Sequence, residues 1–298
     1  MGPLCVTDCD STIPPGLSDA SGGPAVLGYV PLIAAESESL RAFASCATPP
    51  QNDRVLTFRE LDDPSELVSL LRLRHRVYVE QCSYGAAKPL GLDLTAHDAR
   101  SRLFGVFRGE LLVGGVRFVF RQEQRHATIM RALHAVAEHE KLDRTSRLLP
   151  SEEAFDLVAP LGPRRELIDL EVSRLITLRP GVEPGLVLEI MIATLAAAHL
   201  ASCRMYLYSC STQLGPRYAR VTNPRWTFSE PVSAGIESDR FAFPLPTIAA
   251  VAAVEDSPYL EQALAYADEL ERTGRIALYA GRSTTQELRL RETGPSSL

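Results

Sequence analysis

The sequence predicts an α/β fold in three layers, with helices on both faces of an α+β mixed sheet. First, residues 165–178 form a nearly continuous aliphatic and β-branched run without Gly or Pro, which is typical of a central strand. Second, an apolar helical segment at 186–200 and a strand at 203–209 follow, and such a β-α-β unit is expected to be a right-handed parallel crossover. Third, apolar runs at 103–107 and 111–120 are joined by a polar turn that predicts a hairpin.

Composition and charge exclude several classes of protein. The chain has 298 residues with 31 Lys and Arg against 37 Asp and Glu, a net charge of −6, so we do not expect a nucleic-acid binder. We expect no integral membrane segment, because no apolar run approaches the roughly 18–20 residues that cross a bilayer, and no secretory signal. The six cysteines form no Cys-x-x-Cys pair, which predicts reduced thiols in a cytoplasmic protein. No metal site is expected, because His134 and His139 lack the spacing of a zinc helix.

Composition also divides the chain into three parts. Residues 1–50 are rich in Ser, Pro and Gly and show no period, which predicts a disordered N-terminal tail. Residues 51–250 carry the predicted sheet and form the main domain. Residues 251–298 contain an Ala-rich acidic helix followed by a polar tail, and we interpret them as a C-terminal helical appendage.

The remaining elements follow in order. A short strand is expected at 55–58, and Asp63-Pro64 caps a helix of about 17 residues. Residues 82–100 lack periodicity and form a loop of functional length. In the hairpin, Gly114-Gly115 predicts a bulge or a close approach of two backbones. Beyond the crossover we expect a short helix and two further strands, at 213–220, 226–229 and 241–243.

Charged residues interrupt the apolar pattern at several places. The central strand contains Asp169, Glu171 and Arg174, Arg74 lies on the apolar stripe of the first helix, and Arg117 lies inside the hairpin strand. A buried charge costs several kcal/mol unless it is paired, so these residues form either a structural ion-pair network or a site. Glu171 and Arg174 are three apart, and a regular strand points them to opposite faces. Either the strand contains a bulge or the two serve separate clusters.

This order of elements resembles the fold of the Gcn5-related N-acetyltransferase superfamily. The local sequence resembles one branch of it, the acyl-homoserine-lactone synthases and N-acyl amino acid synthases. The resemblance covers residues 55–245. It rests on a first block, Leu73-Arg74-His75-Arg76-Val77-Tyr78-Val79-Glu80-Gln81-Cys82-Ser83-Tyr84, on Asp98 and Arg117, and on Glu171-Val172-Ser173-Arg174, which is similar to a Glu-x-Ser-Arg signature.

Two departures from the family pattern concern the acceptor side. Tyr78 and Tyr84 stand where lactone synthases favour Phe and Trp, and the first of two acidic positions falls near Thr95, with Asp93 offset. An amino acid or another amine is therefore favoured over homoserine lactone formation.

The resemblance implies an N-acyltransferase that moves a fatty acyl group from acyl carrier protein, or from acyl-CoA, to the amine of an amino-acid-like acceptor. The alternatives are an acetyl-CoA-dependent N-acetyltransferase and a non-catalytic acyl-binding module of the same fold. No permanently bound cofactor is implied. The implied catalytic residues are Glu171, Ser173 and Arg174, and the implied substrate-binding residues are Arg74, Tyr78, Tyr84, Asp98 and Arg117. The arginines would pair with Asp98 and Glu171, with Asp169 as a further candidate.

Simple chemistry is consistent with these roles. An α-amino group titrates near ~7.7–8, so Glu171 could act as base directly or through water. Backbone N–H groups at residues 173–177 would stabilise the oxyanion. The pantetheine arm would lie between strands 165–178 and 203–209, with its phosphate end at the helix that starts near Gly185.

Residues 179–185 lack the Gly-rich loop of ordinary acetyltransferases, which favours a carrier-protein donor. An acidic carrier protein would need a basic patch, for which Arg217, Arg220 and Arg225 are candidates. Tyr218 is either a general acid or a packed aromatic residue.

Overall fold

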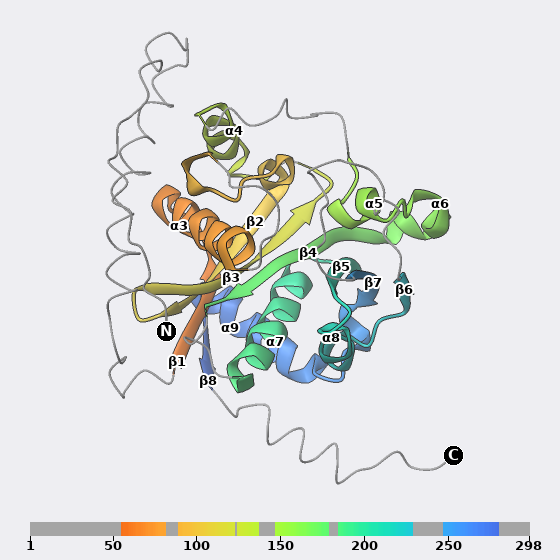
Figure 1. Ribbon diagram of the computed structural model, residues 1–298. Coiled ribbons are helices and arrows are strands. Elements are labelled where there is room, and N and C mark those ends of the chain that lie inside the picture. Colours follow the sequence, from red (N-terminus) through yellow and green to blue (C-terminus); the bar gives the residue numbers. More distant parts are fainter. Residues whose placement is uncertain are drawn as a thin grey trace, which may run out of the picture.

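The computed structural model describes residues 55–81, 89–122, 124–136, 147–178, 184–228 and 247–279. The predicted tail at 1–50, the strand at 241–243 and Tyr84 lie outside the described residues. Within these residues, eight strands form one sheet in the order β6-β7-β5-β4-β3-β2-β1-β8 (Figure 1). The strands are β1 (Val55–Glu60), β2 (Ser101–Arg108), β3 (Leu111–Phe120), β4 (Ile168–Thr177), β5 (Met205–Ser211), β6 (Trp226–Phe228), β7 (Thr247–Ala253) and β8 (Ile276–Tyr279).

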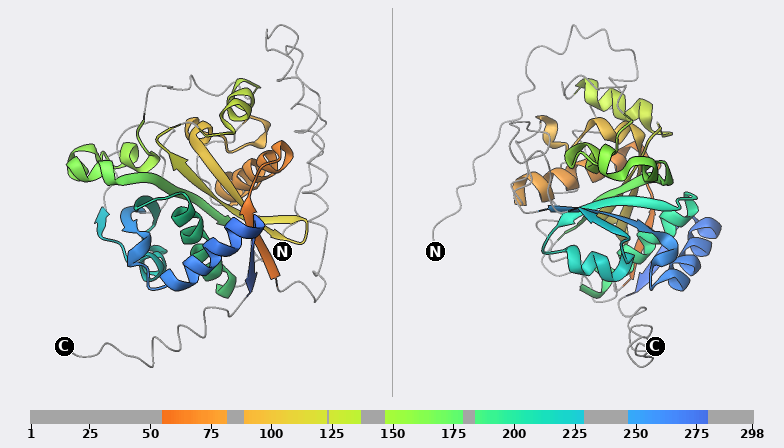
Figure 2. Two further views of the ribbon diagram at one scale, coloured as in Figure 1. Left: turned by 180° about the vertical axis from the view of Figure 1, so that it is seen from behind. Right: turned by 90° about the vertical axis from the view of Figure 1, so that its right-hand side faces the viewer.

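Helices cover both faces of this sheet, as the right-hand view of Figure 2 shows. One face carries α3 (Pro64–His75), the π-helical turn η1 (Arg76–Gln81), η3 (Ala96–Arg100) and α4 (Ala127–Val136), and α5 (Pro150–Ala154) and α6 (Val158–Leu161) continue along it beside the start of β4. The other face carries α7 (Pro184–Leu200), α8 (Gly215–Thr222) and α9 (Leu260–Thr273). The described residues also contain the short turns η2 (Pro89–Gly91), η4 (Gly162–Leu167) and η6 (Val254–Asp256). The predicted three-layer α/β class is confirmed.

The central strand lies where the sequence predicts it. β4 pairs antiparallel with β3 and parallel with β5, and α7 forms the crossover between β4 and β5. The strand begins at Ile168 because residues 162–167 form a 3₁₀ turn. Its parallel pairing with β5 ends at Val172 and Tyr208, although both strands continue. β4 and β5 therefore diverge halfway along their length.

The hairpin is also confirmed, and its glycines fit the predicted close approach. β2 and β3 pair antiparallel from Ser101 to Arg108. A Cβ on Gly114 would lie 2.7 Å from the carbonyl oxygen of Ile176, and one on Gly115 would lie 2.7 Å from that of Phe104. The register between β3 and β4 shifts at Gly115, so the predicted irregularity lies in this pairing.

The first helix has the predicted start, but α3 has 12 residues, and the predicted length of about 17 is reached only with the π-helical turn that follows it. Asp63 accepts a 2.7 Å hydrogen bond from the backbone N–H of Ser65, and Pro64 occupies the first turn. α3 continues directly into the π-helical turn Arg76–Gln81, which carries Tyr78. Such turns are rare and frequently occur at functional sites.

The C-terminal region requires a correction. Composition predicts an appendage at residues 251–298, but a boundary at residue 250 falls inside β7. β8 pairs with β1 at the opposite edge of the sheet, and α9 packs against α7 with Tyr266 fully buried. Residues 247–279 are therefore part of the main domain.

Candidate active site

Buried charges gather on the α3 face of the sheet. Arg74 projects from α3 and its side chain is 1% exposed. Its Nε donates to Asp93 at 2.9 Å and its Nη1 donates to Asp98 at 2.7 Å. The loop that the sequence predicts at 82–100 thus supplies both carboxylates. Asp93 is offset from the family pattern in the sequence, but it forms a buried ion pair with Arg74.

Arg117 joins the same group from β3. Its Nη1 donates to Thr95 Oγ1 at 2.8 Å and to Asp98 at 3.3 Å, and its Nε donates to Ser173 Oγ at 3.0 Å. Thr95 in turn donates its N–H and its hydroxyl to Asp98. Burial alone would raise the pKa of Asp98, but the Arg74 and Arg117 guanidinium groups hold it well below its usual range. Asp98 is therefore a carboxylate, as its pairing requires.

Arg174 reaches this group through an irregularity of β4. Its φ is +56°, a left-handed conformation that is unusual for a residue with a side chain. Between the pairs Arg117–Ser173 and Gly115–Ile176, β4 has two residues where β3 has one, which defines a bulge.

The bulge places Glu171, Ser173 and Arg174 on one face, so the predicted alternation to opposite faces does not apply. The Arg174 guanidinium lies 3.6 Å from Asp93 and 4.6 Å from the centre of the Tyr78 ring. We call Arg74, Asp93, Asp98, Arg117 and Arg174 the charged cluster.

Glu171 has different partners from those predicted. It is 1% exposed and accepts two hydrogen bonds from Ser151, from the backbone N–H at 2.7 Å and from Oγ at 2.8 Å. Burial raises its pKa to about 7, against the effect of the Ser151 hydrogen bonds and the nearby Arg117. No described arginine forms an ion pair with it. Asp169 also lies outside the cluster, with a 3.4 Å contact from the N–H of Arg204.

The sequence pattern does not single out two residues of α5 that lie near Glu171. Ser151 is one, and the other is Glu152, which is fully buried and accepts from Arg121 at 2.6 Å and Arg165 at 3.0 Å. A signal was present in Pro150-Ser151-Glu152-Glu153, which reads as a helix start. That pattern predicts the start of a helix, but it does not predict that Ser151 in the first turn contacts Glu171 of β4.

The opposite face of β4 borders an apolar cavity where β4 and β5 diverge. Its volume is about 30 Å³. β4 contributes Val172 and Leu175, on either side of the bulge. The other lining residues come from β5, α7 and α8 and are Met191, Thr194, Leu195, Ala198, Tyr206, Tyr208, Tyr218, Val221 and Thr222. The gap predicted between these strands is present, and it is apolar.

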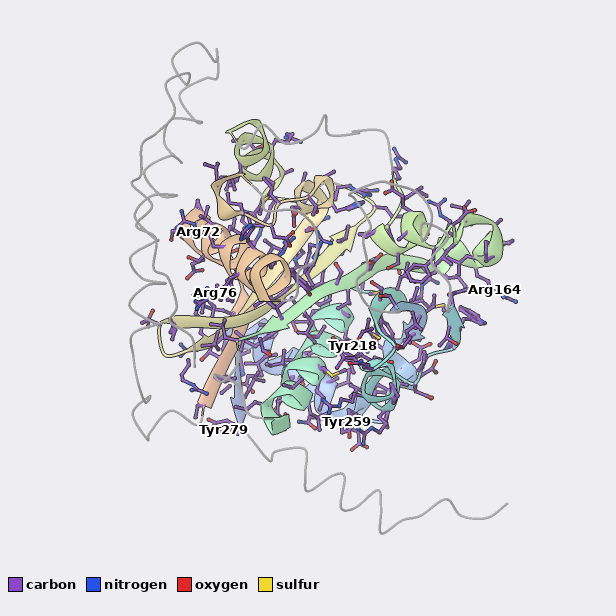
Figure 3. The ribbon with its side chains drawn as sticks, viewed as in Figure 1. Arg72, Arg76, Arg164, Tyr218, Tyr259 and Tyr279 are labelled. Atoms are coloured by element: carbon purple, nitrogen blue, oxygen red, sulfur yellow. The ribbon has the colours of Figure 1, made fainter. Side chains whose placement is uncertain are left out.

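Tyr218 lines the cavity, and Tyr78 contacts Arg174 of the charged cluster. Tyr218, labelled in Figure 3, belongs to α8 on the α7 side of the sheet, and its ring stacks on Tyr208 with centroids 5.6 Å apart. Burial raises the Tyr218 pKa. Burial likewise raises the pKa of Tyr78 to about 12. Both are neutral phenols near neutral pH, and Tyr218 has the packing of the predicted aromatic alternative.

The predicted basic patch is reduced to two residues. Arg217 and Arg220 are exposed on α8. Arg225 hydrogen bonds to Asp256 and lies 3.1 Å from Glu255, so its charge is neutralised. Within the described ranges, no three His, Cys, Asp or Glu side chains are grouped as metal ligands. Over the same ranges, every helix is too short or too polar to cross a bilayer.

Comparison with known proteins gives structural matches only. No protein-family model and no curated protein matches the sequence. Similar solved structures include FeeM, an N-acyl amino acid synthase from uncultured soil microbes, with 15% identity, a TM-score of 0.45 and coverage of 72% of this chain and 97% of that one. BjaI, a CoA-dependent acyl-homoserine lactone synthase, has 20% identity, a TM-score of 0.42 and coverage of 69% and 82%. Drosophila melanogaster polyamine N-acetyltransferase has 13% identity, a TM-score of 0.39 and coverage of 66% and 99%.

These proteins are of the kinds that the sequence motifs resemble. All three TM-scores lie below 0.5, so the function proposed for this chain rests on its own topology and side chains.

Proposed function

We propose that the protein is an N-acyltransferase that moves an acyl group from a thioester of acyl carrier protein or coenzyme A to a small amine. The observation that carries the proposal is the divergence of β4 from β5 at Val172, with an apolar cavity on one side of β4 and the charged cluster on the other. An acyl thioester and a polar amine require these two environments next to each other.

The reaction needs a nucleophile, a base and donors for the oxyanion. The amine nitrogen attacks the thioester carbonyl, the C–N bond forms, the C–S bond breaks, and the sulfur leaves as a thiol. Glu171 accepts the amine proton, directly or through water, and a carboxyl with a pKa of about 7 suits this task near neutral pH. Beyond Val172, β4 has no partner strand on its β5 side among the described residues, so this edge is available for a pantetheine arm and an oxyanion.

One assay identifies both the acyl donor and the amine acceptor. Thiol release from acyl-CoA and from acyl carrier protein is measured across chain lengths with a panel of amines, and products are identified by mass spectrometry. Release that requires both a donor and an amine supports the proposal. If acetyl-CoA is the only donor that gives amine-dependent release, the result favours an N-acetyltransferase. Tight binding of an acyl ligand without thiol release favours a binding module.

The cavity provides a direct control. Leu195 is 3% exposed and lines it from α7, so Leu195→Phe would fill space that the proposal gives to the donor. We expect a higher KM for donors, with longer acyl chains affected most, and an unchanged KM for the amine. An unchanged donor KM in the folded variant would remove the cavity from the acyl site.

A further inference from the structure

Both oxygens of the Glu171 carboxylate are held by one residue, Ser151 of α5. The Ser151 backbone N–H donates to Oε2 at 2.7 Å, and its hydroxyl donates to Oε1 at 2.8 Å. Glu171 is 1% exposed and Ser151 is 2% exposed, so these two donors stand where a charged carboxylate would otherwise need water. Hydrogen bonds donated to a carboxylate favour its charged form. Ser151 therefore supplies the polar partners that a buried base requires.

The segment that carries Ser151 is fixed in place by a second buried carboxylate. Glu152 is fully buried and accepts hydrogen bonds from Arg121 at 2.6 Å and from Arg165 at 3.0 Å. Arg121 directly follows β3, and Arg165 lies in the turn that leads into β4. These ion pairs tie α5 to both strands of the pair that contains Glu171. The position of Ser151 relative to the base is therefore built into the fold.

The charged groups around Glu171 do not share this role. Arg117 of β3, Arg100 of η3 and Glu152 of α5 are close enough to affect the ionisation of Glu171. The hydrogen bonds of both arginines go to other groups, and Glu152 accepts from its own arginines. Among the described residues, Ser151 is the one hydrogen-bond partner of the Glu171 side chain. The short-range control of this carboxylate therefore belongs to Ser151.

We propose that Ser151 is the positioning residue of the base, and that its two donors keep Glu171 charged and oriented for proton transfer. This inference rests on the proposed role of Glu171 in N-acyl transfer. Ser151 acts through Glu171 and takes no part in bond formation. The amine nitrogen forms the C–N bond, its proton passes to the Glu171 carboxylate, and the C–S bond breaks. Glu171 then returns a proton, through solvent, to the leaving sulfur.

Infrared titration of the full chain tests the inference without turnover. The carboxyl C=O band of Glu171 is isolated by subtracting the spectrum of the same protein with Glu171→Gln. The wild-type band should disappear with a midpoint near the Glu171 pKa of about 7. Ser151→Ala removes one charge-assisted hydrogen bond, which changes the ionisation equilibrium roughly 10-fold or more, so the midpoint should rise by at least about one pH unit. Ser151→Thr keeps the hydroxyl and should stay near the wild-type midpoint.

Ser257→Ala is the matched control. Ser257 is also a buried serine, and its hydroxyl donates to the backbone oxygen of Val221, which packs on the α7 face of the sheet. Its loss should leave the Glu171 midpoint unchanged. A wild-type midpoint in folded Ser151→Ala, or a shift of equal size in Ser257→Ala, would overturn the inference.

Turnover separates this inference from the proposed function. A base with a raised pKa stays protonated to higher pH, so Ser151→Ala should lose about 10-fold in kcat/KM at about pH 6 and recover most of it at about pH 9. The neutral fraction of the amine changes equally for both proteins and cancels in their ratio.

Thiol release by Ser151→Ala with the wild-type pH profile, or with an equal loss at both pH values, supports N-acyl transfer and overturns the role of Ser151. A raised infrared midpoint in Ser151→Ala, without thiol release by the wild type from any donor, supports the action of Ser151 on Glu171 and refutes the transferase.

Discussion

Replacing Glu171 by glutamine is expected to stabilise the protein at alkaline pH. Burial raises the pKa of Glu171 from 4.5 to about 7. A carboxyl whose pKa is higher in the folded state contributes stability below its unfolded pKa, and loses that contribution as the pH rises through the folded pKa. The wild type therefore carries a penalty above pH 7 that a neutral amide avoids.

The size of this effect follows from the two pKa values. Their difference corresponds to about 3 kcal/mol, since one pKa unit is worth about 1.4 kcal/mol. Glutamine fits the same partners, because the Ser151 N–H can donate to the amide oxygen and the Ser151 hydroxyl can rotate to accept from the amide nitrogen. Glu171→Gln should therefore gain about 2–3 kcal/mol over the wild type at about pH 8.5 and little at about pH 5.

Urea denaturation of both proteins at the two pH values measures this difference. Glu152→Gln is the control, because Glu152 is also buried but is held by Arg121 and Arg165. Its loss should destabilise the protein by about 3–5 kcal/mol at both pH values, because two guanidinium groups lose their partner. A Glu171→Gln protein that is less stable than the wild type at about pH 8.5 would refute the reasoning.

The same variant links stability to function. If Glu171 is the base, Glu171→Gln should also slow acyl transfer by about 10²–10⁴-fold while leaving the KM of the donor nearly unchanged. A gain in stability with a loss in rate is the signature of a group kept for chemistry rather than for folding. Unchanged turnover in the stabilised variant would remove Glu171 from the mechanism.

Three further predictions concern the charged cluster and the strands around it. Asp98→Asn should lose about 3–5 kcal/mol at neutral pH by urea denaturation. The pKa of Asp98 is depressed in the folded protein, so acid removes its contribution to stability, and the loss should shrink as the pH falls below about 4. As a control, Asp268→Asn at an exposed position should change the stability little. Gly115→Ala should lose at least about 1–3 kcal/mol, since its Cβ would lie 2.7 Å from the backbone oxygen of Phe104, and a gain in the melting temperature would contradict this. Arg174→Gly should be about 1 kcal/mol more stable than Arg174→Ala, because only glycine adopts a φ of +56° without strain, and the reverse order in thermal denaturation would show that the bulge relaxes.

The sequence predicts which charges are buried better than it predicts their partners. Arg74 and Arg117 stand out because they interrupt apolar patterns, and both are buried in the structure. The family spacing places the first acidic residue near Thr95, two positions after Asp93, so Asp93 does not stand out in the sequence as a partner of Arg74. Contact between Arg74 and Asp93 depends on the path of the loop, which no periodicity encodes.

The strands after residue 246 show a different limit. β7 reads Thr-Ile-Ala-Ala-Val-Ala-Ala, and alanine favours helices, so the local pattern does not indicate a strand. Burial against β5 and β6 outweighs that preference, and five residues of the strand are fully buried alanine and valine: Ala249, Ala250, Val251, Ala252 and Ala253. β8 pairs with β1, and almost the whole described chain lies between these two strands in the sequence. Pairing between strands so far apart in the sequence leaves no local signal.

A single extra residue in β4 builds both halves of the candidate site. Without the bulge at Arg174, alternation would turn that guanidinium toward the cavity, where a charge would lose its water without gaining a partner. With it, Ser173 and Arg174 both face the charged cluster and Leu175 faces the cavity. The bulge also follows immediately after Val172, where β4 leaves β5. The sequence shows the conflict as a carboxylate and a guanidinium at the wrong spacing for one face, and the strained backbone of Arg174 resolves it.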